Sequence, residues 1–185
     1  MDRRKKYTQM VLKDSLIKLL KEKQISSITV KEICTRADIN RSTFYAHYSD
    51  QYDLLHKIED EIIEDMNAYL SKYNFTEEKE SLQITEKILE YIVTKRDICQ
   101  TLLNENGDPT FQKRVMTVVR RFMMQNWRDV NNLDKEITGY MSTFIVSGSL
   151  YVIRGWLDQG MDKSPKEMAE LINNIINKGI SSIKV

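Results

Sequence analysis

The sequence is poor in the two residues that build tight turns. Its 185 residues include only six glycines and two prolines. A fold of many short strands needs frequent turns, so this composition argues against a β-sandwich or a β-barrel. Charged residues make up 30% of the chain and hydrophobic residues 41%, which excludes a disordered chain. The composition favours a globular protein built from long helices.

Cysteine is scarce as well. Cys34 and Cys99 are the only two, and neither belongs to a CxxC pattern or has a histidine nearby at metal-ligand spacing. This pattern argues against a disulfide framework and against a zinc site. Each cysteine lies in an apolar helical pattern, which favours buried free thiols and a cytoplasmic location.

Segments that would target or anchor the chain are also missing. The basic N-terminus is followed by "VLKDSLIKLL", in which charges interrupt the apolar core that a secretory signal requires. The uncharged stretch 137–153 is shorter than the ~20 residues of a transmembrane helix. We expect that stretch to be a helix buried on most sides, and we expect no contact with a membrane.

Catalytic motifs are absent from the sequence. It contains no GxSxG, P-loop, HExxH or glycine-rich dinucleotide motif. His47 and His56 are the only histidines, and the second shows no acidic or thiol partner at ligand spacing, which predicts a solvent-facing or packed ring. We therefore expect no enzyme activity, no cofactor and no metal.

The two signs of charge are unevenly distributed. Residues 1–50 hold eleven lysines and arginines against six acidic residues, whereas residues 51–185 hold 17 against 21. The basic N-terminal part indicates an anionic partner, with nucleic acid as the first candidate. A solvated basic helix is the alternative, so the charge alone decides little.

Apolar residues recur with the period of an amphipathic helix along most of the chain, and no run alternates like a strand. The pattern predicts an all-α fold. The expected helices are 3–23, 30–37, 41–48, 50–71, 80–95, 98–104, 111–129, 135–159 and 165–183.

Two helix starts stand eleven residues apart. Thr29 and Glu32 form a capping box, and Asn40 is a good N-cap for a second short helix. The three-residue turn 38–40 joins the two helices into a helix-turn-helix, whose second helix enters the major groove of DNA. Apolar pairs with the spacing of hydrophobic staples flank both caps: Ile28 with Ile33, and Ile39 with Phe44.

The second short helix presents an outer face that is unusual for a solvated helix. When Phe44 points inward, Ser42 and Ala46 point outward. This face fits a major groove ~12 Å wide, where an arginine can pair with guanine and small or aromatic groups can contact thymine methyl groups. Instead of lysine and glutamate, the outer face and its flanks carry small groups, hydroxyls and one aromatic ring, with an arginine at the tip. These residues are Arg41, Ser42, Thr43, Tyr45 and Ala46.

Phosphate contacts are expected from the same region. Hydroxyl, imidazole and ammonium groups can donate hydrogen bonds to phosphate oxygens, as can the N–H groups at the start of the helix after Thr29. The side chains concerned are Lys31, Ser42, Thr43, Tyr45 and His47.

The stretch "ITVKEICTRADINRSTFYAHYSDQYDLL" closely resembles the DNA-binding region of TetR-family transcriptional regulators, and the likeness covers residues 5–60. It implies an all-α homodimer with a helix-turn-helix DNA-binding domain, residues 1–60, and an effector-binding and dimerisation domain, residues 61–185. The match is carried by Thr29, Ile33, Ala37, Ile39, Arg41, Thr43, Phe44, Tyr45, His47, Tyr48, Leu54 and Leu55.

The resemblance also implies roles for individual residues. Lys31, Arg41, Ser42, Tyr45 and Ala46 fall at base-reading positions. Thr29, Thr43 and His47 fall at phosphate-contacting positions.

Two residues depart from the family pattern. Asp38 stands where the family usually has glycine, and aspartate tolerates a left-handed conformation, so we expect the turn to survive at a small cost. Gln51 stands where a phosphate-contacting lysine is frequent, so we expect DNA binding to depend less steeply on salt.

The C-terminal half looks like the regulatory domain of a TetR subgroup common in Gram-positive bacteria. This likeness implies that the helices near 135–159 and 165–183 pair with their copies as a four-helix bundle. The first of these helices carries an aromatic stripe, for which a core or a dimer seam is favoured over the wall of a ligand cavity. The stripe consists of Tyr140, Phe144, Tyr151 and Trp156.

These observations predict a DNA-binding transcriptional regulator. The favoured hypothesis is a repressor that binds a palindromic double-stranded operator as a homodimer and responds to a small-molecule effector among its C-terminal helices. The alternative is a co-activator or adaptor that binds a protein partner through its C-terminal domain.

Overall fold

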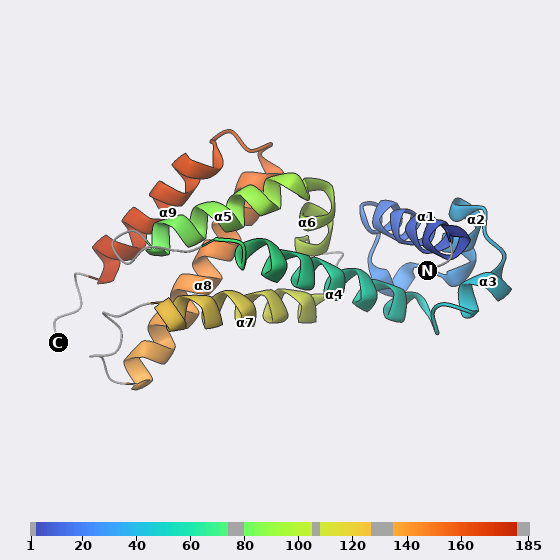
Figure 1. Cartoon of the computed structure of the whole chain (residues 1–185), viewed down its shortest axis with the longest axis horizontal. Coiled ribbons are helices and arrows are strands. Elements are labelled where there is room, and N and C mark those ends of the chain that lie inside the picture. The colour runs from blue at the N-terminus through green and yellow to red at the C-terminus, as the bar shows by residue number, and fades with distance from the viewer. Residues whose placement is uncertain (1–2, 74–79, 105–107, 127–134, 181–185) are drawn as a thin grey trace. The chain divides into compact units, whose positions relative to one another are not determined.

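A computed structural model of the chain describes residues 3–73, 80–104, 108–126 and 135–180. Within these ranges the chain forms nine α-helices, one short 3-10 helix and no strand, so the predicted all-α fold is confirmed there (Figure 1). The elements are α1 (Arg3–Leu20), η1 (Ile25–Ser27), α2 (Val30–Ala37), α3 (Arg41–Tyr45), α4 (Gln51–Leu70), α5 (Glu80–Thr94), α6 (Arg96–Leu103), α7 (Pro109–Asn126), α8 (Lys135–Asp158) and α9 (Pro165–Ile180).

The chain divides into two compact units. The first unit comprises Met1–Asp65 and Asp97–Phe111, and the second comprises Met66–Arg96 and Gln112–Val185. The first unit therefore holds α1 to α3, most of α4 and nearly all of α6.

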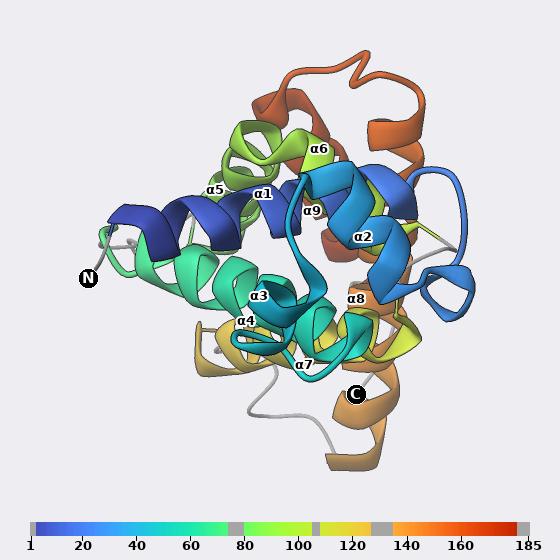
Figure 2. The same cartoon turned by 90° about the vertical axis from the view of Figure 1, so that its right-hand side faces the viewer.

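The core of the first unit forms where α1, α2 and α3 pack together (Figures 1 and 2). Leu12, Leu16 and Leu20 recur every four residues along α1, and none of them has any exposed surface. Full burial of one such side chain stabilises a fold by about 1.5–3 kcal/mol. Residues of the next three helices complete this core: Ile33, Phe44, Leu54, Leu55 and Ile58.

Capping boxes start two helices, and the one at Thr29 confirms the prediction. The Thr29 N–H donates to Glu32 Oε2 at 2.9 Å, and the Glu32 N–H donates to Thr29 Oγ1 at 3.3 Å. At the start of α9, the Ser164 N–H donates to Glu167 Oε2 at 2.8 Å, and the Glu167 N–H returns a bond to Ser164 Oγ. Each box satisfies N–H groups that have no partner inside the helix.

The turn between α2 and α3 is built on Asp38. This residue adopts the left-handed conformation, with φ 53° and ψ 46°, as expected for the position where the family usually has glycine. The Ile39 N–H donates to the Cys34 carbonyl at 3.0 Å, which is the bond that closes a Schellman motif. The chain can therefore reverse within three residues.

Two helices end three residues earlier than predicted, at positions that described residues follow. The first ends at Leu20 instead of Lys23 because a turn leads into η1, which buries Ile25. The helix predicted over 41–48 is α3, which ends at Tyr45. The N–H groups of His47 and Tyr48 both donate to the Phe44 carbonyl at 2.9 Å, so the chain tightens into a turn that buries Tyr48.

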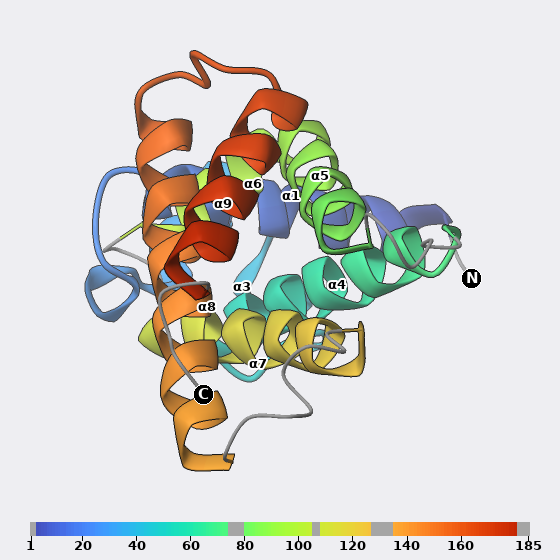
Figure 3. The ribbon, with the colours of Figure 1, turned by 90° about the vertical axis from the view of Figure 1, so that its left-hand side faces the viewer.

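In the second unit, α9 packs along α5 (Figure 3). The predicted stripe on α8 does not stay on one face. Trp156 is buried, and its Nε1–H donates to the Lys163 carbonyl at 3.0 Å. Tyr140, Phe144 and Tyr151 instead lie on the surface of the chain.

We predict that Asp38→Gly stabilises the first unit by about 0.5–1 kcal/mol, because glycine adopts a left-handed conformation without steric cost. The substitution also removes a negative charge from the carboxyl end of the α2 dipole. Urea unfolding measures the change. Asp38→Ala is the matched variant and should destabilise the unit, so equal stability of the two variants would contradict this explanation.

We also predict a pH effect from Glu32. The hydrogen bond from Lys23, followed by those from Thr29, lowers the pKa of Glu32 to about 2. A carboxyl whose pKa is lowered by folding stabilises the fold above its unfolded pKa, and this stabilisation is lost as the pH falls from about 4.5 to about 2. Glu32→Gln keeps a capping oxygen but not the charge, so thermal unfolding of this variant should depend less on pH in that window. Glu64→Gln, which removes an exposed carboxylate of α4, is the control and should keep the wild-type slope.

Candidate nucleic-acid interface

The start of α3 is set by Asn40. Its Oδ1 accepts the Ser42 N–H at 3.0 Å and the Ser42 hydroxyl at 3.1 Å. Asparagine is a preferred N-cap because its side chain replaces the missing backbone acceptor. The cap therefore fixes the residue at which α3 begins and the direction in which Ser42 points.

An aromatic cluster supports α3 from beneath. Phe44 has no exposed surface, and its ring centroid lies 5.7 Å from that of Tyr48. Tyr45 meets Phe44 edge to face at 5.6 Å while staying 57% exposed. Burial, followed by the charges of Glu61 and Asp53, raises the pKa of Tyr48 to about 12, so its hydroxyl remains neutral. The cluster orients Tyr45 as well as supporting the helix.

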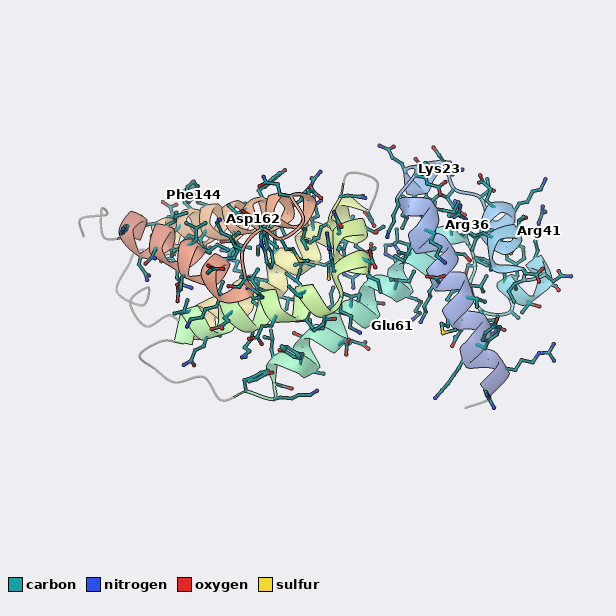
Figure 4. The ribbon with its side chains drawn as sticks, turned by 90° about the horizontal axis from the view of Figure 1, so that it is seen from above. Lys23, Arg36, Arg41, Glu61, Phe144 and Asp162 are labelled. Atoms are coloured by element: carbon teal, nitrogen blue, oxygen red, sulfur yellow. The ribbon has the colours of Figure 1, made fainter. Side chains whose placement is uncertain are left out.

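The residues predicted to read bases lie on the outer surface. Arg41, Ser42, Tyr45 and Ala46 are all exposed, and Arg41 projects outward from the ribbon (Figure 4). Ala46 follows the last residue of α3 but keeps a helical conformation, with φ −72° and ψ −12°. It therefore shares the outer face although α3 ends one residue earlier. Lys31 is exposed on the first turn of α2.

The residues predicted to contact phosphate are placed less uniformly. Thr43 and His47 are half-buried, and the His47 ring lies 6.2 Å from the Tyr48 ring. Thr29 is exposed, but its hydroxyl donates to Glu32 Oε2 at 2.8 Å and accepts the Glu32 N–H. The capping box thus already uses this hydroxyl, and its contact with phosphate stays a prediction.

Salt bridges neutralise part of the basic charge in the first unit. Lys13 pairs with Glu61 at 2.5 Å, and Arg36 pairs with Glu22 at 3.0 Å. Lys23 pairs with Glu32 at 2.5 Å. Among the described residues, Lys31 and Arg41 form no salt bridge. Their charges therefore remain available to an anionic partner.

One expectation about the histidines is wrong. His56 was expected to lack an acidic partner, but its Nδ1 lies 3.1 Å from Glu59 Oε2, and Glu59 is fully buried. Residues three apart on a helix are neighbours, so the sequence contained this signal.

The buried thiols predicted from the sequence are confirmed. Cys34 and Cys99 are both buried free thiols, and burial raises the pKa of Cys34. Among the described residues, no helix combines the length and the apolar character needed to cross a membrane.

Comparison with known families matches both parts of the chain. Residues 14–58 match the model of the bacterial regulatory proteins of the tetR family. Residues 79–178, more than half of the chain, match the model of a transcriptional regulator C-terminal region of TetR type.

A curated relative is YxbF of Bacillus subtilis (strain 168), an uncharacterized HTH-type transcriptional regulator. It is 28% identical over 176 residues, which cover 91% of this chain but 44% of the relative. The chain thus spans less than half the length of that protein.

Solved structures share the fold at lower identity. A TetR transcriptional regulator from Streptococcus agalactiae 2603V superposes with a TM-score of 0.67 at 21% identity, covering 95% of this chain and 96% of that one. The fatty acid degradation regulator FadR from Bacillus halodurans gives 0.68 at 10% identity, with 94% and 96% covered. The dihydroxyacetone kinase operon activator DhaS gives 0.59 at 16% identity, with 96% and 98% covered.

Two observations agree on the family of this chain. One is the helix-turn-helix with its outward-facing Arg41, and the other is the pair of family matches over both parts of the chain. The family consists of transcription regulators and not of enzymes, in agreement with the missing catalytic motifs. The chain belongs to the TetR family of bacterial regulatory proteins.

Proposed function

We propose that the protein is a homodimeric, ligand-responsive repressor whose two α3 segments read a palindromic operator. The observation that carries this proposal is the outer face of α3, which presents Arg41, Ser42, Tyr45 and Ala46 above the buried ring of Phe44. Ser42 and Ala46 are small, so they allow the helix to come close to the base edges in the major groove. Further contacts with DNA, around this face, would come from Thr29, Lys31, Thr43 and His47.

The short segment between α3 and α4 supports a rigid connection between these two helices. The Ser49 N–H donates to Asp53 Oδ2 at 2.9 Å, and the Asp53 N–H donates to Asp50 Oδ1 at 2.8 Å. These two bonds, which share Asp53, hold the start of α4 close behind the end of α3. A change that moves the start of α4 would therefore also move the reading helix, which is what a response to an effector requires. An effector achieves this only if it binds one arrangement more tightly than the other.

Exposed apolar side chains on α8 and α9 support the homodimer. Tyr140 and Phe144 on α8 are 78% and 79% exposed, and Leu171 and Ile175 on α9 are exposed as well. Large apolar patches on a surface mark interaction sites. A methyl group added at Gly139 or Gly148 would meet no atom of the same chain within 4 Å, so both glycines leave room for a second helix. A two-fold pairing of α8 and α9 would bury these side chains and place two copies of α3 on one operator.

We predict that Arg41→Ala and Tyr45→Ala each weaken binding to an operator selected from random duplexes. The loss of one base contact should lower the affinity about 5- to 150-fold. Fluorescence anisotropy at a fixed salt concentration measures this change. Lys166→Ala removes an exposed positive charge from α9 and should bind like the wild type. Wild-type affinity in both α3 variants would refute the proposed reading surface.

We predict that Phe144→Asp converts a dimer into a monomer, because each copy would bring a charge into the apolar seam. Light scattering coupled to size-exclusion chromatography measures the mass, and circular dichroism checks that the helices persist. Tyr52→Asp, a matched change of an exposed aromatic residue in the first unit, should remain dimeric. A wild-type chain that is monomeric at all concentrations would instead favour the adaptor alternative, in which the apolar patch binds a different protein.

A further inference from the structure

Three potential metal ligands converge in the first unit, away from the reading surface. His56 and Glu59 lie one turn apart on α4, and Asp108 immediately precedes α7. One ligand atom from each of the three lies within 4.8 Å of the other two. The three residues belong to the same compact unit although nearly fifty residues separate Glu59 from Asp108.

The burial of Glu59 distinguishes this group from an ordinary acidic surface. Its side chain has no exposed area, whereas that of His56 is 49% exposed. A carboxylate withdrawn from water must be compensated by positive charge or by hydrogen bonds. His56 Nδ1 lies 3.1 Å from Glu59 Oε2, and a cation bound between these two groups would add positive charge beside the buried carboxylate. The exposed imidazole gives such an ion a path from solvent.

The distances suit a small cation. Nitrogen and oxygen ligands lie about 2.0–2.2 Å from ions such as Zn²⁺, so two ligands of one ion are at most about 4.4 Å apart. The 3.1 Å between His56 Nδ1 and Glu59 Oε2 is typical of neighbouring ligands. The ligand atoms of the group are at most 4.8 Å apart. Binding one ion would require this distance to decrease by only a few tenths of an ångström, which a side-chain rotation provides.

Asp108 is held in place for this role. Its Oδ1 accepts the Thr110 N–H at 2.8 Å, and its Oδ2 accepts the Thr110 hydroxyl. Each carboxylate oxygen has two acceptor sites, so these bonds leave capacity for an ion. Hydrogen bonds of this kind orient the carboxylates that bind metals in proteins.

We propose that His56, Glu59 and Asp108 bind a first-row divalent transition-metal ion, with water completing its coordination. One imidazole nitrogen and two carboxylate oxygens suit Zn²⁺, Mn²⁺ or Fe²⁺, whereas Mg²⁺ prefers oxygen ligands alone. The ion would link α4 to the residue that immediately precedes α7. An influence of the ion on operator binding rests on the proposed function, but the existence of the site does not.

Calorimetric titration of the untagged full-length chain with ZnCl₂ and with MnCl₂, without DNA, tests the proposal. One of the two ions should bind saturably with one site per chain and raise the temperature of unfolding. His56→Gln and Asp108→Asn should each weaken binding of the ion at least about tenfold. Loss of a residue that only hydrogen-bonds a metal ligand already weakens metal binding by about this factor, and loss of a ligand should cost at least as much. Asparagine is as good an N-cap as aspartate, so Asp108→Asn removes a charged ligand without removing the cap of α7.

His47→Gln and Glu64→Gln are the matched controls, because they remove the other imidazole and an exposed carboxylate of the same unit. Both should bind the ion like the wild type. The proposal is overturned if neither ion binds saturably, or if His56→Gln, a change at a half-exposed position, binds as tightly as the wild type. Because no DNA is present, a failure here is separate from a failure of the proposed repressor function.

Discussion

The burial of Phe44 is the constraint on which the reading surface depends. A helix of five residues cannot form by itself in water, because nucleation costs more than so few hydrogen bonds return. Full burial of the phenylalanine ring contributes about 1.5–3 kcal/mol, and the Asn40 cap contributes about 1 kcal/mol more. The helix α3 is short because its stability comes from the burial of Phe44 and from the Asn40 cap, and not from its own hydrogen bonds. It extends only as far as the residues that Phe44 and Tyr48 hold from beneath.

The same arrangement frees the outer face from structural duties. Because Asn40, Phe44 and Tyr48 hold the helix, Ser42 and Ala46 need not contribute to its stability. Tyr45 combines both functions, since its ring edge packs against Phe44 while most of the side chain stays exposed. A surface that carries little of the folding energy can be selected for what it binds. This division explains why the face departs so strongly from a solvated helix.

Most of the fold could be predicted where local chemistry determines it. The capping boxes at Thr29 and Ser164 involve residues three apart, so both helix starts could be read from the sequence. The left-handed Asp38 was likewise expected from its place in the turn. The outer face of α3 followed from helical periodicity alone, because one inward-pointing phenylalanine fixes the direction of its neighbours.

Features that depend on tertiary contacts could not be predicted in the same way. The end of α3 at Tyr45 results from the packing of Tyr48, which no local signal announces. On α8, apolar residues occur on several faces, so periodicity could not separate the buried Trp156 from the exposed Phe144. The approach of Asp108 to His56 joins residues distant in the sequence and requires the fold itself.

The central claim is that the outer surface of α3 lies against base pairs, and site-directed crosslinking from Ala46 tests it most directly. Cys34 and Cys99 are both buried, so a photoreactive thiol reagent would attach selectively to the new cysteine of Ala46→Cys. With a selected duplex, we expect crosslinks to bases in two major-groove segments about 34–36 Å apart. A duplex that binds the labelled protein with wild-type affinity but forms no crosslink to its bases would contradict the account.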